Sequence, residues 1–485
     1  MEACQGTQTT FAEAIVLVAR GTCDFQVKIQ NAMAQGAGGV IIMDNADDTA
    51  AFGIALQQTF DIPVTTVTKA TGEKILSLLG GQTNVQVSAS SGLSLVDNPT
   101  GGQISSFSSY GPSYTMDIKP EVMAPGGSIF STLAQADGLY GTMSGTSMAT
   151  PFIAGCIALL MEAGVERNPE YIKQLLMSTA DQVSANHGTE LATVAHQGAG
   201  LVNVVKALNA MHQVSPSKLA LLDPAKGGFA DDKVTKEITV TNRGSASVTY
   251  DLTAVSALSV TSFNATQHMT TPVFGGQGPQ VQLNPAQVTV DAGQSVKVNV
   301  EITQPSAATQ ANLVYSGFVQ GKVSGQTEVA WSIPLMGLNS DYSSLPFFTP
   351  TEAPNPGVYS LTTKKPVTAN NVETFSMANR NFPVFSMQVQ FPISSWEWYV
   401  AEEASPDQVF LTIESGAAFV RDFVGKSQPA MYAWTGVGTD QNGVNITAPD
   451  GNYMFVLSYT TPLGDPAKSE DKLSWKSPVF AVKRG

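Results

Sequence analysis

The sequence places one serine in a setting that suits nucleophilic attack. Ser147 lies in the run GTSMATP, and the apolar run FIAGCIALLM follows directly. The apolar run predicts a helix that passes through a core, because its apolar residues cover nearly every side. Ser147 would then lie at the helix N-terminus, where unpaired backbone N–H groups and the helix dipole favour negative charge. A tetrahedral oxyanion forming beside Ser147 could accept a hydrogen bond from the Ser147 N–H.

The residues around Ser147 suit this chemistry. Gly145 would let the backbone and a substrate approach each other closely, and Pro151 would fall in the opening turn of the helix. The predicted supporting loop consists of Gly145, Thr146, Met148, Ala149 and Pro151. A serine at a helix start can also be a simple N-cap, so the motif needs support from the rest of the chain.

The base that would activate Ser147 is not found in the residues before it. A hydroxyl is a poor nucleophile until a neighbouring base takes its proton, and residues 1–146 contain no histidine. The histidines of the chain are His187, His196, His212 and His268. The last two lie at and beyond the start of a β-rich region, where surface roles are predicted for them.

One alternative takes the partners of Ser147 from downstream. Asp181 with His187 or His196 would give the order Ser, Asp, His of an α/β-hydrolase. That fold expects the motif G-x-S-x-G, whereas Ala149 holds its last position here. It also expects parallel strands after the serine, whereas a pattern typical of a β-sandwich follows.

Composition limits the classes of function. The net charge of −14 and the pI of about 4.7 argue against a nucleic-acid partner. The length of 485 residues predicts several domains, and no apolar run approaches the length of a membrane span. A charged content of only 13% fits a secreted protein, either extracellular or associated with a cell wall. No metal-binding or cofactor motif is evident, and the oligomeric state is left open.

The cysteines and two sequons also fit secretion. Cys4 and Cys23 flank a short loop and a strand-like run, and a disulfide between them would remove about 3 kcal/mol of unfolded-state entropy. Cys156 lies among small apolar residues and is predicted to be a buried hydrophobe. Asn264 and Asn445 begin sequons that are compatible with glycosylation.

Residues 1–92 alternate predicted strands and helices. The runs AIVLVA, GGVIIMDN, IPVTTVT and NVQVSAS predict strands, and DFQVKIQNAMAQG predicts a helix that ends at Gly36. GEKILSLLG predicts a second, shorter helix. The first twenty residues lack the charge pattern of a signal peptide, which predicts that Met1 lies inside a domain. This segment resembles a protease-associated domain, a non-catalytic module inserted in secreted subtilisin-like peptidases.

Residues 93–212 carry the nucleophile motif and further landmarks in order. KPEVMAPGGSIFST precedes SGTSMATP, GAGLVNVVKAL follows it, and NPEYIKQLLMSTA predicts a helix capped by Asn168. This order resembles the C-terminal half of a subtilisin-like catalytic domain. Tyr110, Glu121 and Phe152 stand where Arg, Asp and His are commoner in that family.

The remaining chain alternates apolar and polar residues with the period of β-strands. Residues 213–340, with Val296, Val298, Val300 and Ile302 on one face, resemble a fibronectin type III-like sandwich. Residues 341–485 resemble the sandwich that closes some large subtilases. The predicted fold class is therefore α/β plus β: a partial subtilisin-like domain with a protease-associated α+β insert, followed by two β-sandwiches.

The resemblance implies a serine endopeptidase that forms an acyl-enzyme on Ser147 and acts on protein or peptide substrates. In that family the orienting Asp, the base His and the oxyanion-hole Asn precede the inserted domain, and no residue before Ser147 here matches them. The chain alone is therefore predicted to be nearly inactive. It would also lack the strands that cover its catalytic half, which predicts exposed apolar faces. The alternative is a non-catalytic secreted protein that uses its protease-associated and sandwich domains for binding.

Overall fold

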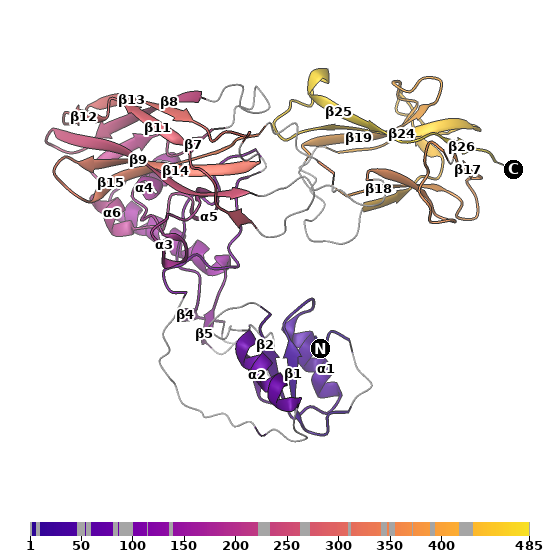
Figure 1. Cartoon of the computed structure of the whole chain (residues 1–485), viewed down its shortest axis with the longest axis horizontal. Coiled ribbons are helices and arrows are strands. Elements are labelled where there is room, and N and C mark those ends of the chain that lie inside the picture. The colour runs from indigo at the N-terminus through magenta and orange to yellow at the C-terminus, as the bar shows by residue number, and fades with distance from the viewer. Residues whose placement is uncertain are drawn as a thin grey trace. The chain divides into compact units, whose positions relative to one another are not determined.

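Figure 1 shows a computed structural model of the chain. It describes residues 2–5, 10–45, 54, 60–80, 86, 100–113, 115–134, 139–221, 233–261, 272–308, 312–340, 347–348, 355–370, 372–388, 393–416 and 430–484. The chain forms two compact units, and each is described by itself. The first unit comprises Met1–Ser109 and Met123–Glu166, and the second comprises Tyr110–Val122 and Arg167–Gly485. This division runs through the predicted catalytic segment 93–212.

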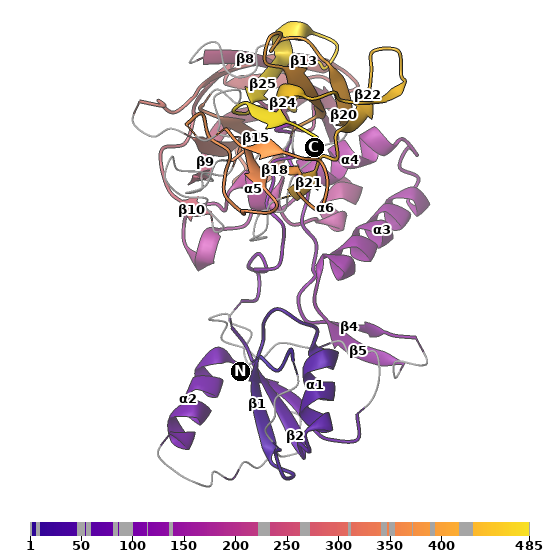
Figure 2. The same ribbon diagram turned by 90° about the vertical axis from the view of Figure 1, so that its right-hand side faces the viewer.

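The described part of the first unit contains short strands and three helices. Its elements are β1 (Ile15–Ala19), α1 (Phe25–Ala34), β2 (Gly39–Met43), β3 (Val64–Val67), α2 (Lys69–Leu79), β4 (Ile129–Thr132), β5 (Tyr140–Met143) and α3 (Thr146–Glu162). The first three strands form a parallel sheet in the order β1-β2-β3, and α1 and α2 flank it (Figure 2). The predicted strand NVQVSAS falls almost entirely outside the described residues.

Local sequence signals explain the helices beside this sheet. Gly36 has a φ of 83° just beyond α1, a conformation that few other residues adopt, and this confirms the predicted helix end. Helix α2 begins earlier than predicted because Thr68 caps it, its side chain accepting a hydrogen bond from the Thr71 N–H. A disulfide joins Cys4 to Cys23, with 5.7 Å between their Cα atoms.

The second unit begins with short helices that lead into two β-sheets. Its first elements are α4 (Pro169–Ser178), the 3₁₀ turn η2 (Ala185–His187), α5 (Val194–Gln197), α6 (Val204–Asn209), β6 (His212–Ser215), β7 (Leu219–Ala220), β8 (Lys233–Asn242), β9 (Val248–Thr261), β10 (Val273–Phe274), β11 (Gln280–Asn284), β12 (Gln287–Val290), β13 (Ser295–Thr303), β14 (Leu313–Val323) and β15 (Val329–Leu338).

These strands form two sheets around one apolar core. One sheet has the order β10-β9-β14-β15-β7 with β12 paired to β9, and the other has the order β11-β13-β8-β6. Both sheets contribute to the core, for example Val298 from one and Trp331 from the other. Val298, Val300 and Ile302 are fully buried, so the predicted alternation along β13 is confirmed.

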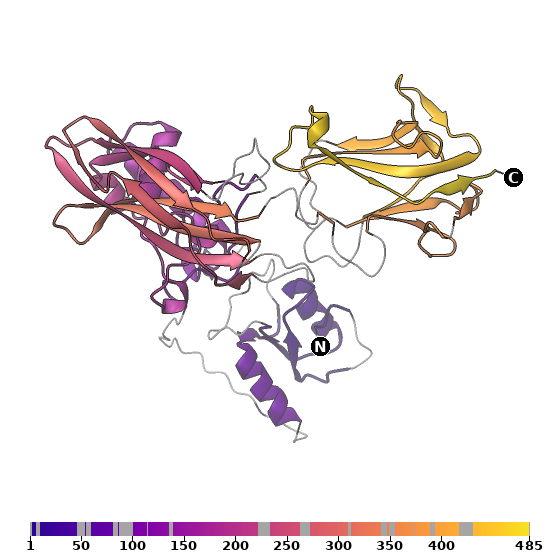
Figure 3. The ribbon, with the colours of Figure 1, turned by 45° about the horizontal axis from the view of Figure 1, so that its top comes forward.

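The C-terminal part of the second unit forms two further sheets (Figure 3). Its elements are β16 (Gly357–Ser360), β17 (Thr374–Phe375), β18 (Pro383–Met387), β19 (Ser395–Glu402), β20 (Leu411–Gly416), β21 (Ala430–Ala433), β22 (Val437–Thr439), β23 (Asn445–Thr447), β24 (Gly451–Thr460), the 3₁₀ turn η5 (Ser469–Asp471), β25 (Lys472–Lys476) and β26 (Phe480–Val482). One sheet is β16-β18-β21, and the other is β17-β26-β24-β19-β20-β22-β23 with β25 paired to β24. Buried aromatic side chains such as Trp398, Trp434 and Phe455 fill the core of this part.

The structure corrects the predicted surface role of His212. This residue is the first of β6, its backbone pairs with Asn242 of β8, and its side chain is buried with only 5% exposed. Its Nε2 has no hydrogen-bond partner among the described residues. Burial disfavours the charged imidazolium and lowers the pKa of His212 from 6.5 to about 4.

We therefore expect a pH window in which His212 lowers the stability of the second unit. Between pH 6.5 and about 4 the unfolded chain binds a proton that the folded chain excludes. Stability should fall across this window as the pH falls, by up to about 3 kcal/mol at about 1.4 kcal/mol per unit. Urea unfolding of wild type and His212→Phe at several pH values measures this. The difference between the two proteins should be constant above pH 7, and a constant difference down to pH 4 would contradict the expectation.

Candidate functional site

Ser147 is the second residue of α3, at an exposed helix N-terminus. The helix begins at Thr146 with Gly145 as its N-cap, and the Ser147 side chain is exposed. The first backbone N–H groups of any helix have no partner within the helix, so the Ser147 N–H is directed away from the helix body. Thr150 Oγ1 donates to the Thr146 carbonyl at 3.0 Å and ties the first turn together. An exposed hydroxyl and helix N–H groups therefore occur at the same residue.

The hairpin of β4 and β5 leads the chain into this turn. Its register pairs Ile129 with Met143, so the loop before β4 lies beside the start of α3. The Gly145 N–H donates to the Gly126 carbonyl at 2.8 Å. The Ser128 N–H donates to Ser144 Oγ at 2.7 Å. Two hydrogen bonds thus fix the approach to Ser147.

The close backbone approach in this turn belongs to Gly126 and not to the predicted Gly145. A Cβ atom at Gly126 would lie 2.9 Å from the Gly145 carbonyl oxygen, a distance that requires a shift of the backbone. A Cβ atom at Gly145 would meet its nearest neighbour at 3.7 Å, and its φ of 160° is an extended conformation. The first glycine of the APGG run is the signal that could have identified this contact.

The structure also differs from the prediction that α3 runs through a core. Cys156 and Leu160 are its buried residues, whereas 46% of Phe152 and 55% of Leu159 are exposed. The other apolar residues of α3 are half-buried or exposed, so its apolar composition is covered only in part. The expected exposure of apolar faces around the nucleophile is thereby found.

Pro151 lies deeper in α3 than predicted. It is the sixth helical residue, beyond the opening turn. Proline has no N–H, so the Ser147 carbonyl lacks the donor that residue 151 would otherwise provide. Met148 and Ala149, the other residues of the predicted supporting loop, are half-buried on α3.

The downstream partners of the α/β-hydrolase alternative have other contacts. The Asp181 side chain accepts hydrogen bonds from Lys206 Nζ at 2.6 Å and from Asn203 Nδ2 at 2.8 Å. His196 is buried, and its ring stacks on Tyr110 with 3.8 Å between the centroids. His187 is exposed in a short 3₁₀ turn. The described contacts of Asp181 therefore contain no histidine.

Two of the sequence landmarks pack against each other in the second unit. A Cβ atom at Gly198 would lie 2.2 Å from the Pro120 carbonyl oxygen and 2.6 Å from that of Glu121. The Ala199 N–H donates to the Glu121 carbonyl at 2.9 Å. At Gly200 the same added atom would lie 2.3 Å from the Asp181 carbonyl oxygen. The KPE and GAG runs are thus complementary halves of one backbone contact.

Charged side chains support this contact. Lys218 Nζ binds Asp117 Oδ2 at 2.7 Å and Glu121 Oε1 at 3.3 Å, and Lys119 Nζ binds Glu121 Oε2 at 2.6 Å. Burial alone would raise the pKa of Glu121, but the hydrogen bonds and charges of the two lysines outweigh it and lower that pKa. Glu121, an unusual residue at this landmark, is therefore held as a carboxylate between two cations.

The other predicted positions are distributed over the chain. Cys156 is buried and not in a disulfide, and Asn445 is exposed at the start of β23. Asn264 and His268 lie outside the described residues. Within the described ranges, no three His, Cys, Asp or Glu side chains are grouped as metal ligands would be. No helix in the described part of the chain is long and apolar enough to cross a membrane.

Comparison with protein families identifies two regions. Residues 30–203 match the Subtilase family, and residues 228–336 match an Fn3-like domain. These matches confirm the predicted resemblances to a subtilisin-like peptidase and to a fibronectin type III-like domain. The first match begins inside α1 and ends just before α6, and the second covers β8 to the end of β15 apart from two residues.

Several curated proteins are similar over most of this chain. The PII-type proteinase of Lactococcus lactis subsp. cremoris is 28% identical over 96% of the chain, which spans 27% of that protein. The minor extracellular protease Vpr of Bacillus subtilis is 28% identical over 74% of the chain and 41% of its own length. The C5a peptidase of Streptococcus pyogenes is 27% identical over 68% of the chain and 28% of its own length. The chain thus spans less than half of each of these relatives.

Proposed function

We propose that this chain, whose residues 30–203 match the Subtilase family, is part of a serine endopeptidase with Ser147 as its nucleophile. The observation that carries the proposal is the exposed Ser147 hydroxyl at the N-terminus of α3, inside the family match. Proteinases that align with 68–96% of the chain support the same reaction class. The substrates would be proteins or peptides, and the protein would act outside the cell or at the cell wall.

The proposed reaction assigns a separate task to each part of the α3 N-terminus. A general base takes the Ser147 proton, and Ser147 Oγ attacks the carbonyl carbon of the peptide bond. The negative charge that develops on the carbonyl oxygen accepts a hydrogen bond from the Ser147 N–H and is favoured by the helix dipole. The amine leaves, and water then hydrolyses the acyl-enzyme.

A histidine base must come from residues other than 1–146, which contain no histidine, and in this proposal its orienting carboxylate accompanies it. We assign them, with an oxyanion-hole asparagine, to polypeptide that would precede the present residues in an intact subtilase. In this proposal residues 1–92 are a protease-associated domain inserted in the catalytic domain, and residues 93–212 are its C-terminal half. Residues 213–340 and 341–485 are the two accessory sandwiches. The exposed faces of α3 support this division, because a complete catalytic domain would cover them.

A reconstitution experiment tests the proposal. The chain alone should hydrolyse a fluorogenic casein substrate no faster than buffer. The same chain joined to an upstream segment that carries the Asp, His and Asn motifs should hydrolyse it at a rate at least about a thousandfold higher, because triad members act as a unit. Folding of the joined protein is checked by circular dichroism. A folded joined protein without activity would reject the peptidase and favour the alternative, a secreted binding protein.

A further inference from the structure

A fully buried lysine lies beside the disulfide of the first unit. Lys28 of α1 has no exposed surface. Its Nζ donates to the Glu2 carbonyl at 2.7 Å and lies 3.5 Å from Cys4 Sγ. Burial lowers the pKa of Lys28, and the charge of the Glu2 carboxylate offsets this only in part. The negative charge of Glu2 therefore does not fully compensate the cost of burying the Lys28 ammonium. A thiolate at Cys4 would add a second negative charge beside it.

The two sulfur atoms differ in their surroundings. Cys23 precedes Asp24, the N-cap of α1, whose side chain makes no capping hydrogen bond. A helix N-terminus favours a thiolate by roughly half a unit charge. Cys4 instead lies 3.5 Å from the full charge of the Lys28 ammonium, in a partly buried contact where electrostatic interactions are stronger than in water. The pair is therefore asymmetric, and Cys4 is the better site for a developing negative charge.

Two acidic side chains lie near Cys4, and they disfavour a thiolate there less than the Lys28 ammonium favours it. The Glu2 carboxylate lies 3.7 Å from Cys4 Sγ, but it is exposed and already accepts hydrogen bonds from the Thr22 N–H and hydroxyl. Asp24 is also exposed. Water screens exposed charges much more than buried ones, so the buried ammonium dominates at Cys4.

We propose that the Cys4–Cys23 disulfide is a directional thiol-exchange site, in which an external thiol attacks Cys23 and Cys4 leaves as a thiolate beside Lys28. The attacking thiolate forms a bond to Cys23 Sγ, the Cys4–Cys23 bond breaks, and its electron pair stays on Cys4 Sγ. A second external thiolate then attacks the mixed disulfide. This releases the external disulfide and a Cys23 thiolate. Two external thiols are oxidised and the protein disulfide is reduced by two electrons.

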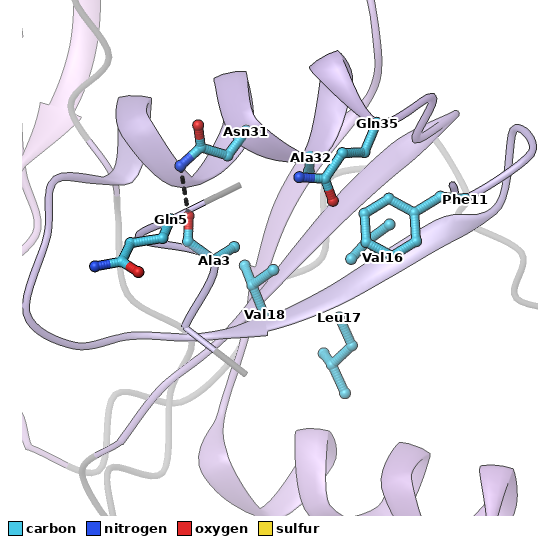
Figure 4. Close-up of a pocket in the computed structure, with 9 residues that line it drawn as sticks. All are labelled: Ala3, Gln5, Phe11, Val16, Leu17, Val18, Asn31, Ala32 and Gln35. Carbon is cyan, nitrogen blue, oxygen red and sulfur yellow. Dashed lines mark hydrogen bonds between the residues drawn. The ribbon is translucent and has the colours of Figure 1, made fainter. Parts of the chain in front are cut away.

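Exchange at this site would release one wall of a cavity. The cavity has a volume of about 180 Å³, and Ala3 and Gln5, on either side of Cys4, line it together with apolar residues of β1. Figure 4 shows the hydrogen bond that Asn31 Nδ2 of α1 donates to the Ala3 carbonyl, at 2.9 Å. The disulfide, this hydrogen bond and the Lys28 contact with Glu2 hold residues 2–5 against α1. Reduction breaks the disulfide and leaves the two hydrogen bonds.

The first test measures the rate at which reduced glutathione opens the disulfide of the present chain at fixed pH. Lys28→Met should slow this rate about tenfold, because the leaving thiolate loses its cation. Lys28→Arg should keep most of the wild-type rate, and Lys74→Met removes an exposed lysine of α2 as a matched control. Equal rates for wild type and a folded Lys28→Met protein would overturn the proposal.

The second test uses the wild-type protein and does not depend on a variant that folds. A brief exposure to reduced glutathione is quenched with iodoacetamide, and the peptides are mapped by mass spectrometry. Glutathione should be found on Cys23 and the alkyl group on Cys4, at a ratio of at least about five to one over the reverse. An even distribution, or glutathione mainly on Cys4, would overturn the proposal. Neither test involves Ser147, so the outcome is independent of the proposed peptidase activity.

Discussion

Ser147→Ala is expected to abolish peptide hydrolysis in the protein that carries the upstream Asp, His and Asn motifs. The loss in kcat should be about 10³- to 10⁶-fold, because the hydroxyl is the atom that forms the acyl-enzyme. The residual rate would come from the N–H groups at the start of α3, which the substitution leaves in place. Substrate binding, measured as KM, should change little, since the Ser147 side chain is small and exposed. Steady-state kinetics with a fluorogenic peptide measures both constants.

A matched variant separates loss of the nucleophile from general damage. Ser131→Ala removes another exposed serine of the same unit, on β4, and should retain full activity. A fluorophosphonate probe should label wild type and Ser131→Ala, and it should fail to label Ser147→Ala. Hydrolysis by Ser147→Ala within tenfold of the wild-type rate would remove Ser147 from the mechanism.

Local sequence signals predict the helices best. Asn168 and Pro169 predict the start of α4. In the structure, Asn168 Oδ1 accepts hydrogen bonds from the Glu170 and Tyr171 N–H groups. The predicted inner residues of α4, such as Ile172 and Leu175, are buried. A cap and its helix lie within a few residues of each other, so no distant partner decides the outcome.

Features that depend on distant pairing could not be predicted in this way. His212 is buried because β6 pairs with β8, and nothing in its immediate neighbours indicates that pairing. The contact at Gly126 depends on the β4–β5 hairpin, which brings the loop before β4 to the start of α3. The exposure of α3 could not be predicted for the same reason. Its apolar composition indicates that the helix has apolar surface to bury, but not which residues pack against that surface.

Gly198→Ala is expected to be strongly destabilising, costing the second unit about 3–5 kcal/mol. Two effects combine. The φ of 59° at Gly198 strains any residue with a Cβ atom, and that atom would lie 2.2 Å from the Pro120 carbonyl oxygen. The atoms nearest to that Cβ are backbone atoms of Pro120 and Glu121, so relief requires the chain at 120–121 to move. This movement would break the hydrogen bond from Ala199 to Glu121 and shift Glu121 from Lys218.

Gly293→Ala separates strain from clash within the same unit. Gly293 has a similar φ of 71°, but an added Cβ atom there meets no atom of the described residues within 4 Å. Strain alone should therefore cost about 1–2 kcal/mol at this position. Urea unfolding of both variants, followed by tryptophan fluorescence, gives the comparison. Equal losses would show that the 120–121 backbone yields easily, and the packing of KPE against GAG would then contribute little to the stability of the unit. A larger loss of stability for Gly198→Ala would mean that the close backbone packing of the KPE run against the GAG run contributes to the stability of the unit.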